Sequence, residues 1–147
     1  MAILKANYQP RSRTDGIGRS VAYYTWREGA DQPRTWHDQD GRELGYDDVR
    51  EQVAERASES AYTYRVVLST RDATLDHADY AEVLGEQFDC WYVTTHHAGS
   101  HPHAHAIAFT DELLDVDEVR RMREHLHDLE IEAERQLDRG AAAEWSP

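Results

Sequence analysis

The chain has 147 residues, a length typical of a single domain, and 39% of them are hydrophobic. Its 29 acidic residues outnumber the 16 basic ones, and the resulting net charge of −13 disfavours binding to nucleic acid by overall charge attraction. No apolar run is long enough to span a membrane, and the first residues lack the pattern of a signal peptide. Cys90 is the single cysteine, which excludes an internal disulfide. We therefore expect a cytoplasmic protein without a membrane partner.

The first half of the chain is predicted to hold one strand and two helices. Residues 2–9 can form a strand, and the turn residues that follow predict a loop over 10–18. Residues 19–28 are predicted to be helical. The region 30–45 is rich in glycine and polar residues and is predicted to be a long loop. A second helix is expected over 47–58.

The second half is predicted to hold three strands and two helices. Residues 62–70 are rich in β-branched and aromatic side chains, which is typical of a strand. A helix is expected over 76–88, followed by strands over 91–97 and 101–109. A long helix is predicted from Asp115 or Asp117 to about residue 139.

This order of elements predicts an α+β fold, in which a central antiparallel sheet is covered by helices. We expect residues 1–139 to form one domain and residues 140–147 to form a flexible C-terminal tail.

The charged residues have an unusual composition, because Lys5 is the only lysine and the other fifteen basic residues are arginines. Many carboxylates with almost no lysine are typical of proteins from a halophile's cytoplasm. At molar salt the Debye length is only about 3 Å, so the local distribution of charge matters more than the net charge. Residues 1–34 carry six basic and three acidic residues, and an arginine-rich amino end on an acidic body is a first indication of function.

A cluster of histidines lies near the predicted strands 91–97 and 101–109. His103 and His105 alternate with alanines, so both point to one face of their strand while the small side chains let a helix pack behind it. The short connection predicts that the two strands pair antiparallel, which brings His96 or His97 close to that pair. Three histidine ligands with open coordination positions are typical of a catalytic metal site, and imidazole suits Zn²⁺, Mn²⁺, Ni²⁺ or iron.

Two motifs carry a resemblance to a known family. The segment HPHAHAIAF, after a strand ending in HHAG, resembles the metal motif of relaxases, the conjugation and mobilisation branch of the HUH endonucleases. The segment GRSVAYYTWREG, 18–29, resembles the nucleophile helix of MobA/MobL-type mobilisation proteins. By this match Tyr24 takes the place of the nucleophile, and its neighbour Tyr23 is the alternative. The tyrosines precede the histidines, which is the order found in relaxases.

The resemblance implies a relaxase-like sandwich fold and a metal-dependent nickase and strand transferase that acts on single-stranded DNA. It implies a 5′-phosphotyrosine intermediate and a divalent metal such as Mn²⁺ or Mg²⁺, with Zn²⁺ or Ni²⁺ as substitutes in vitro. It also implies a role in plasmid mobilisation or rolling-circle replication, with replication or mobilisation accessory proteins as partners. Four arginines of the amino end are candidates to hold DNA phosphates: Arg11, Arg13, Arg19 and Arg27.

Three aromatic side chains are candidates to stack on unpaired bases: Tyr8, Trp26 and Trp36. For the two tryptophans the alternative is packing in the core, which the sequence favours more for Trp26 than for Trp36.

The sequence departs from the family pattern in ways that leave alternatives open. The string HAG favours His97 as the third ligand, whereas the usual seven-residue step to His103 favours His96. Many relaxases carry an acid two residues after the first histidine, and with His96 in that role the position is Ala98. The alternative function is therefore a catalytically inactive relaxase-like DNA-binding or accessory protein. A third possibility is a metal enzyme with the same histidines that does not act on DNA.

Overall fold

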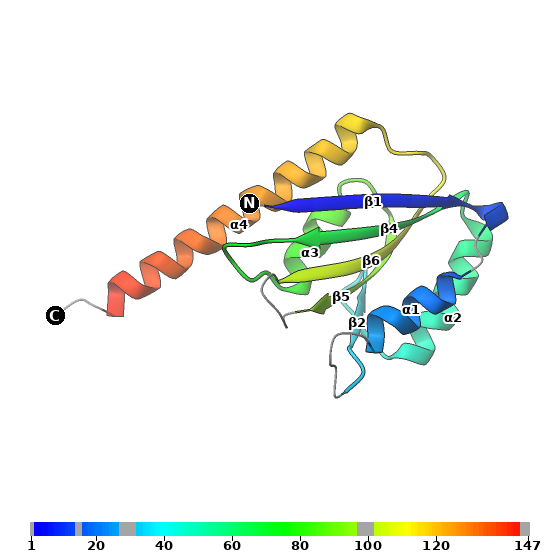
Figure 1. Ribbon diagram of the computed structural model, residues 1–147, viewed down its shortest axis with the longest axis horizontal. Coiled ribbons are helices and arrows are strands. Elements are labelled where there is room, and N and C mark those ends of the chain that lie inside the picture. Colours follow the sequence, from blue (N-terminus) through cyan, green and yellow to red (C-terminus); the bar gives the residue numbers. More distant parts are fainter. Residues whose placement is uncertain (1, 14–15, 27–31, 97–101, 145–147) are drawn as a thin grey trace.

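A six-stranded sheet, antiparallel throughout, forms the centre of the protein, with strand order β1-β4-β6-β5-β2-β3 (Figure 1). This computed structural model describes residues 2–13, 16–26, 32–96 and 102–144. The strands are β1 (Ile3–Pro10), β2 (Trp36–Asp38), β3 (Glu43–Leu44), β4 (Tyr62–Ser69), β5 (Cys90–His96) and β6 (His103–Thr110). The predicted antiparallel pairing of β5 and β6 is confirmed.

Four α-helices and one short 3-10 helix accompany the sheet in the described part of the chain. They are η1 (Arg11–Arg13), α1 (Ile17–Trp26), α2 (Tyr46–Glu59), α3 (His77–Leu84) and α4 (Val116–Glu144). Helices α3 and α4 cover one face of the sheet, and α1 and α2 pack on part of the other. The predicted α+β class is thus confirmed. No helix within these described residues is both long and apolar enough to cross a membrane.

The larger core lies between the sheet and the pair α3 and α4. The three alanines of β6, Ala104, Ala106 and Ala108, are fully buried and face Met122 and Leu126 of α4. Because an alanine side chain is small, the helices can approach the sheet closely at this point. The expectation that the alanine face of this strand packs against a helix is confirmed.

The second core lies under α1 and α2. The apolar residues of α2 recur at helical spacing and bury Val49, Val53 and Ala57 against the sheet. Ile107 of β6 belongs to this core, so the two faces of β6 differ. The alanine face packs against α3 and α4, whereas the other face carries His103 and His105 and packs Ile107 under α1 and α2. This second face positions the candidate site.

The structure differs from the predicted elements in several places. The predicted loop over 10–18 holds η1 and the start of α1, which spans Ile17–Trp26 rather than residues 19–28. The predicted loop over 30–45 contains the short strands β2 and β3, because Trp36 is drawn into the core and its indole N–H donates to Thr25 Oγ1 at 2.9 Å. Helix α3 ends at Leu84 rather than residue 88, with Gly85 as its C-cap. Helix α4 continues to Glu144, five residues beyond its predicted end, since the alanines at 141–143 favour helix strongly. Figure 1 shows this helix running past the sheet towards the C-terminus.

Candidate metal centre

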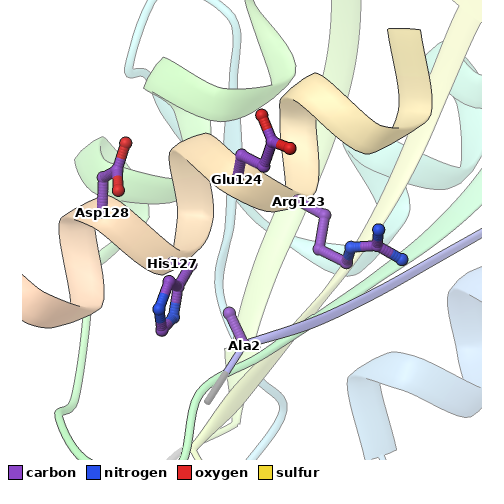
Figure 2. Close-up of a pocket in the computed structure, with 5 residues that line it drawn as sticks. All are labelled: Ala2, Arg123, Glu124, His127 and Asp128. Atoms are coloured by element: carbon purple, nitrogen blue, oxygen red, sulfur yellow. The ribbon is translucent and has the colours of Figure 1, made fainter. Parts of the chain in front are cut away.

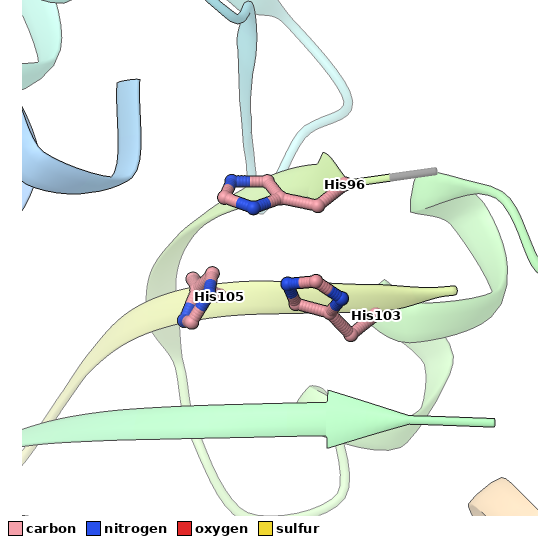
Figure 3. A group of neighbouring side chains, drawn as sticks. All are labelled: His96, His103 and His105. Carbon is pink, nitrogen blue, oxygen red and sulfur yellow. The ribbon is translucent and has the colours of Figure 1, made fainter. Parts of the chain in front are cut away.

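The sheet register brings three histidines together. His96, the last residue of β5, pairs directly with His103 of β6, and His105 lies on the same face two residues further along β6. The centroids of the three imidazole rings are 4.7 to 5.1 Å apart. Figure 3 shows the rings gathered above β5 and β6.

These three side chains fit a single divalent metal ion. Each offers one ring nitrogen, and the three nitrogens lie within 4.8 Å of one another. His96 is only 1% exposed, whereas His103 and His105 are half-buried. A set of three neutral ligands leaves an ion its full positive charge and leaves coordination positions for a substrate.

Of the two candidates for the third ligand, His96 and His97, the structure describes only His96. His96 joins His103 and His105 as the seven-residue spacing predicts. The alternative ligand His97, and with it Ala98, lies outside the described residues.

Tyr24 of α1 lies directly on this cluster. Its ring is stacked on the imidazole of His105, with the centroids 4.1 Å apart and the planes inclined by 10°. The neighbouring Tyr23 is 47% exposed, and its ring centroid is 6.1 Å from that of Tyr24. Adjacent residues on a helix point about 100° apart, so the helix directs Tyr24 to the histidines and Tyr23 towards solvent.

The backbone of Tyr24 also contacts the cluster. Nε2 of His96 donates a hydrogen bond to the carbonyl oxygen of Tyr24 at 3.0 Å, since a carbonyl can only accept. This bond requires the proton on Nε2, so Nδ1 of His96 is the ring nitrogen available to a metal ion. Carbonyls that orient metal-binding histidines in this way are a common second layer around metal sites.

The Tyr24 hydroxyl has a perturbed environment. Burial raises the pKa of Tyr24 above its usual value, and the nearby guanidinium of Arg65 lowers it in part. Arg65 lies on β4 and its Nε donates to Ser20 Oγ of α1 at 2.8 Å. No sequence motif predicted Arg65 as a residue near the site. The signal that could have found it is the charged residue in the middle of an otherwise uncharged strand, YTYRVVLS.

Three of the four arginines predicted to bind DNA are exposed. Arg11 and Arg13 form the ends of η1, and Arg19 lies in the first turns of α1. The fourth, Arg27, lies outside the described residues.

The candidate stacking residues are placed differently from one another. The expectation that Trp36 is available to bases is wrong, because its side chain is fully buried and held by Thr25. Trp26, for which the sequence favoured core packing, is instead 51% exposed and lines an open pocket with Arg34 and Tyr46. Tyr8 packs on Tyr64, a residue of the larger core, and so lies on the face opposite the histidines.

Comparisons of the chain with known protein families, with curated proteins and with solved structures find no match.

Proposed function

We propose that this protein is a metal-dependent nickase and strand transferase for single-stranded DNA, of the relaxase type, with Tyr24 as its nucleophile. The observation that carries this proposal is the stacking of Tyr24 on His105, which places a phenol beside three histidines that could hold one divalent ion. A phenol nucleophile and a metal site on one open face are the two parts that a tyrosine-based phosphoryl transfer requires.

The histidine ligands His96, His103 and His105 would hold the ion, with Mn²⁺ or Mg²⁺ as the expected metals and Zn²⁺ or Ni²⁺ as substitutes. When bound, the ion supplies positive charge that polarises the scissile phosphate and stabilises its non-bridging oxygens. The chain's part is to orient the ligands, and the Tyr24 carbonyl does so for His96.

Tyr24 would attack the phosphorus atom in line. The bond from its Oη to phosphorus forms, the bond from phosphorus to the 3′ oxygen breaks, and the phenol proton is balanced by the proton gained by the leaving 3′ hydroxyl. The phenol is protonated at neutral pH, because the usual pKa of tyrosine is about 10 and burial raises that of Tyr24 further; nearby positive charge such as that of Arg65 favours loss of its proton. The resulting 5′-phosphotyrosine conserves the bond energy for rejoining the strand.

The basic residues of the amino end would hold the strand. Arg11, Arg13 and Arg19 are exposed and can bind phosphates bidentately, and Arg27 is proposed to join them. Trp26, at its open pocket, is suited to stack on an unpaired base. The reaction would serve plasmid mobilisation or rolling-circle replication, together with accessory proteins of either process.

The test is incubation of the full chain with labelled single-stranded DNA and Mn²⁺ in high salt, followed by denaturing electrophoresis. A covalent protein–DNA adduct that requires the metal supports the proposal. DNA binding without any adduct would instead favour a catalytically inactive DNA-binding protein.

A further inference from the structure

The acidic residues avoid one region of the fold. The elements β1, η1, α1, β4, β5 and β6 contain five basic residues and no acidic one, although the chain carries 29 acidic residues. Burial does not explain this, because β1, η1 and α1 expose several side chains each. In a chain of net charge −13, these elements form a locally positive region.

Part of the sheet face in this region is open. On the face that holds the histidines, Lys5 and Asn7 of β1 are exposed, and Arg65 and Ser69 of β4 are half-buried. Helices α1 and α2 pack on the β5 side of this face, around Tyr92 and Ile107. The β1-β4 side of the face therefore presents a surface with two cationic, two polar and two apolar side chains, which we call the open half-face: Ile3, Lys5, Asn7, Arg65, Val67 and Ser69.

The open half-face is continuous with the histidine cluster. Lys5 pairs with Val67, which in turn pairs with His105, so the three residues form one row across the sheet. Neighbouring strands are about 4.8 Å apart, so the backbone of Lys5 lies about 10 Å from that of His105. A long lysine side chain can cover much of that separation.

Within the open half-face, Arg65 contacts α1, the helix that carries the proposed nucleophile. Its Nε donates to Ser20 Oγ at 2.8 Å, and Ser20 is four residues before Tyr24 on α1, which places the two on the same side of that helix. The Ser20 contact uses one donor of the guanidinium and leaves its remaining N–H groups able to bind an anion.

We propose that the open half-face is the surface that binds the DNA backbone next to the scissile phosphate, with Arg65 contacting a phosphate beside Tyr24 and Lys5 contacting one farther across the sheet. The inference rests on the proposed function, because it takes single-stranded DNA as the occupant. Charge complementarity carries it: a phosphodiester strand needs a positive track, and Lys5 and Arg65 lie on the same face as the histidines, with no carboxylate in β1, β4 or β6.

The test measures equilibrium binding of the full chain to a fluorescent single-stranded oligonucleotide by anisotropy, in EDTA, over a series of KCl concentrations. Backbone contacts do not depend on sequence, so a mixed-sequence oligonucleotide serves as the probe. Each lost phosphate contact lowers the slope of log K against log salt by about 0.7 for single strands. We expect Lys5→Gln and Arg65→Gln each to lower the slope by that amount, and Lys5→Arg to retain it.

The matched control is Arg123→Gln. Arg123 is an exposed arginine of α4, on the opposite side of the sheet, where it lines a pocket of about 410 Å³ with Ala2 and His127 (Figure 2). Arg123→Gln removes one positive charge, as Lys5→Gln and Arg65→Gln do, but at a position away from the open half-face. We therefore expect the slope of Arg123→Gln to equal that of the wild type. Circular dichroism at each salt concentration verifies that the variants compared are folded, and Arg65→Lys keeps the charge if Arg65→Gln is unfolded.

The outcomes separate this inference from the proposed function. If the wild type fails to bind, or if Lys5→Gln and Arg65→Gln behave like Arg123→Gln, the open half-face is not the DNA surface, whatever the adduct assay gives. If both variants lose slope while the wild type forms no adduct with Mn²⁺, the surface is supported and the nickase proposal fails.

Discussion

The carbonyl oxygen of Tyr24 accepts a hydrogen bond from Nε2 of His96, at 3.0 Å, so the backbone of α1 orients one histidine of the candidate metal centre. The ring of Tyr24 rests on a second histidine, His105. The position of α1 is thereby coupled to the geometry of the histidine cluster. A shift of this helix would displace Tyr24 and disturb the histidine cluster together.

The chain is expected to bind one divalent ion through its three histidines. His103→Ala removes one of three ligands and should weaken binding at least about tenfold, since even the loss of an outer-layer partner costs that much. In the wild type, a free metal concentration of 100 times the dissociation constant should raise the free energy of unfolding by about 2.7 kcal/mol. Calorimetric titration with Mn²⁺ and thermal unfolding measure the two effects.

The control for this prediction is His127→Ala, because His127 is an exposed histidine on α4 that lies outside the cluster. Equal metal affinity for His103→Ala and the wild type would show that the ion binds elsewhere.

Stability is expected to fall as the pH drops below about 6.5. His37 of β2 is stacked on His77, the first residue of α3, with ring centroids 3.6 Å apart. Burial lowers the pKa of His37, and the charge of His77 lowers it further, whereas Glu43 and Asp38 oppose this. A lowered histidine pKa means that the unfolded chain binds more protons, so the stabilising contribution is complete above the unfolded pKa and is lost as the pH falls through the folded one.

His37→Gln should therefore flatten the dependence of unfolding free energy on pH between about 7 and 5, measured by urea unfolding. A His37→Gln profile as steep as that of the wild type would show that this pair does not control acid stability.

A buried carboxylate on α4 is expected to fix the loop after β4. Glu130 is 1% exposed and accepts hydrogen bonds from the backbone N–H groups of Arg71 and Asp72, at 2.6 and 2.8 Å. Glu130→Ala leaves these donors without their acceptor and should cost about 1–3 kcal/mol of unfolding free energy. The exposed Glu132→Ala on the same helix should change stability by less than about 0.5 kcal/mol. Similar losses for the two variants in urea unfolding would contradict this role.

Salt is expected to stabilise the fold. The 29 acidic residues repel one another, and the Debye length falls from about 10 Å at 0.1 M salt to about 3 Å at 1 M. The melting temperature should rise over this range of KCl. A melting temperature that is independent of KCl would contradict the halophilic interpretation of the composition.

Alternation along one strand predicted the main features of the site. In β6, HAHAIAFT, alanines and histidines occupy opposite faces, so the buried face and the face of His103 and His105 followed from period-two geometry. The short connection to β5 then predicted the pairing that places His96 opposite His103.

Other features depend on tertiary contacts that no local pattern reveals. Strands β2 and β3 are three and two residues long and lie among turn residues, and they form because Trp36 is buried beneath α1. The exchanged roles of Trp26 and Trp36 have the same origin, since helix periodicity does not reveal which indole meets the sheet. Arg65 was missed because its proximity to Tyr24 results from the packing of α1 on β4.

The proposed role of Tyr24 as the nucleophile is tested most directly by comparing Tyr24→Phe with Tyr23→Phe in the Mn²⁺-dependent adduct assay on single-stranded DNA. Tyr24→Phe removes one hydroxyl and keeps both the ring stacked on His105 and the carbonyl bound to His96. We expect it to abolish the covalent adduct while metal and DNA binding remain close to those of the wild type. Tyr23→Phe should retain most of the adduct, because its side chain is directed towards solvent. Undiminished adduct formation by Tyr24→Phe would contradict the central claim that this tyrosine is the nucleophile.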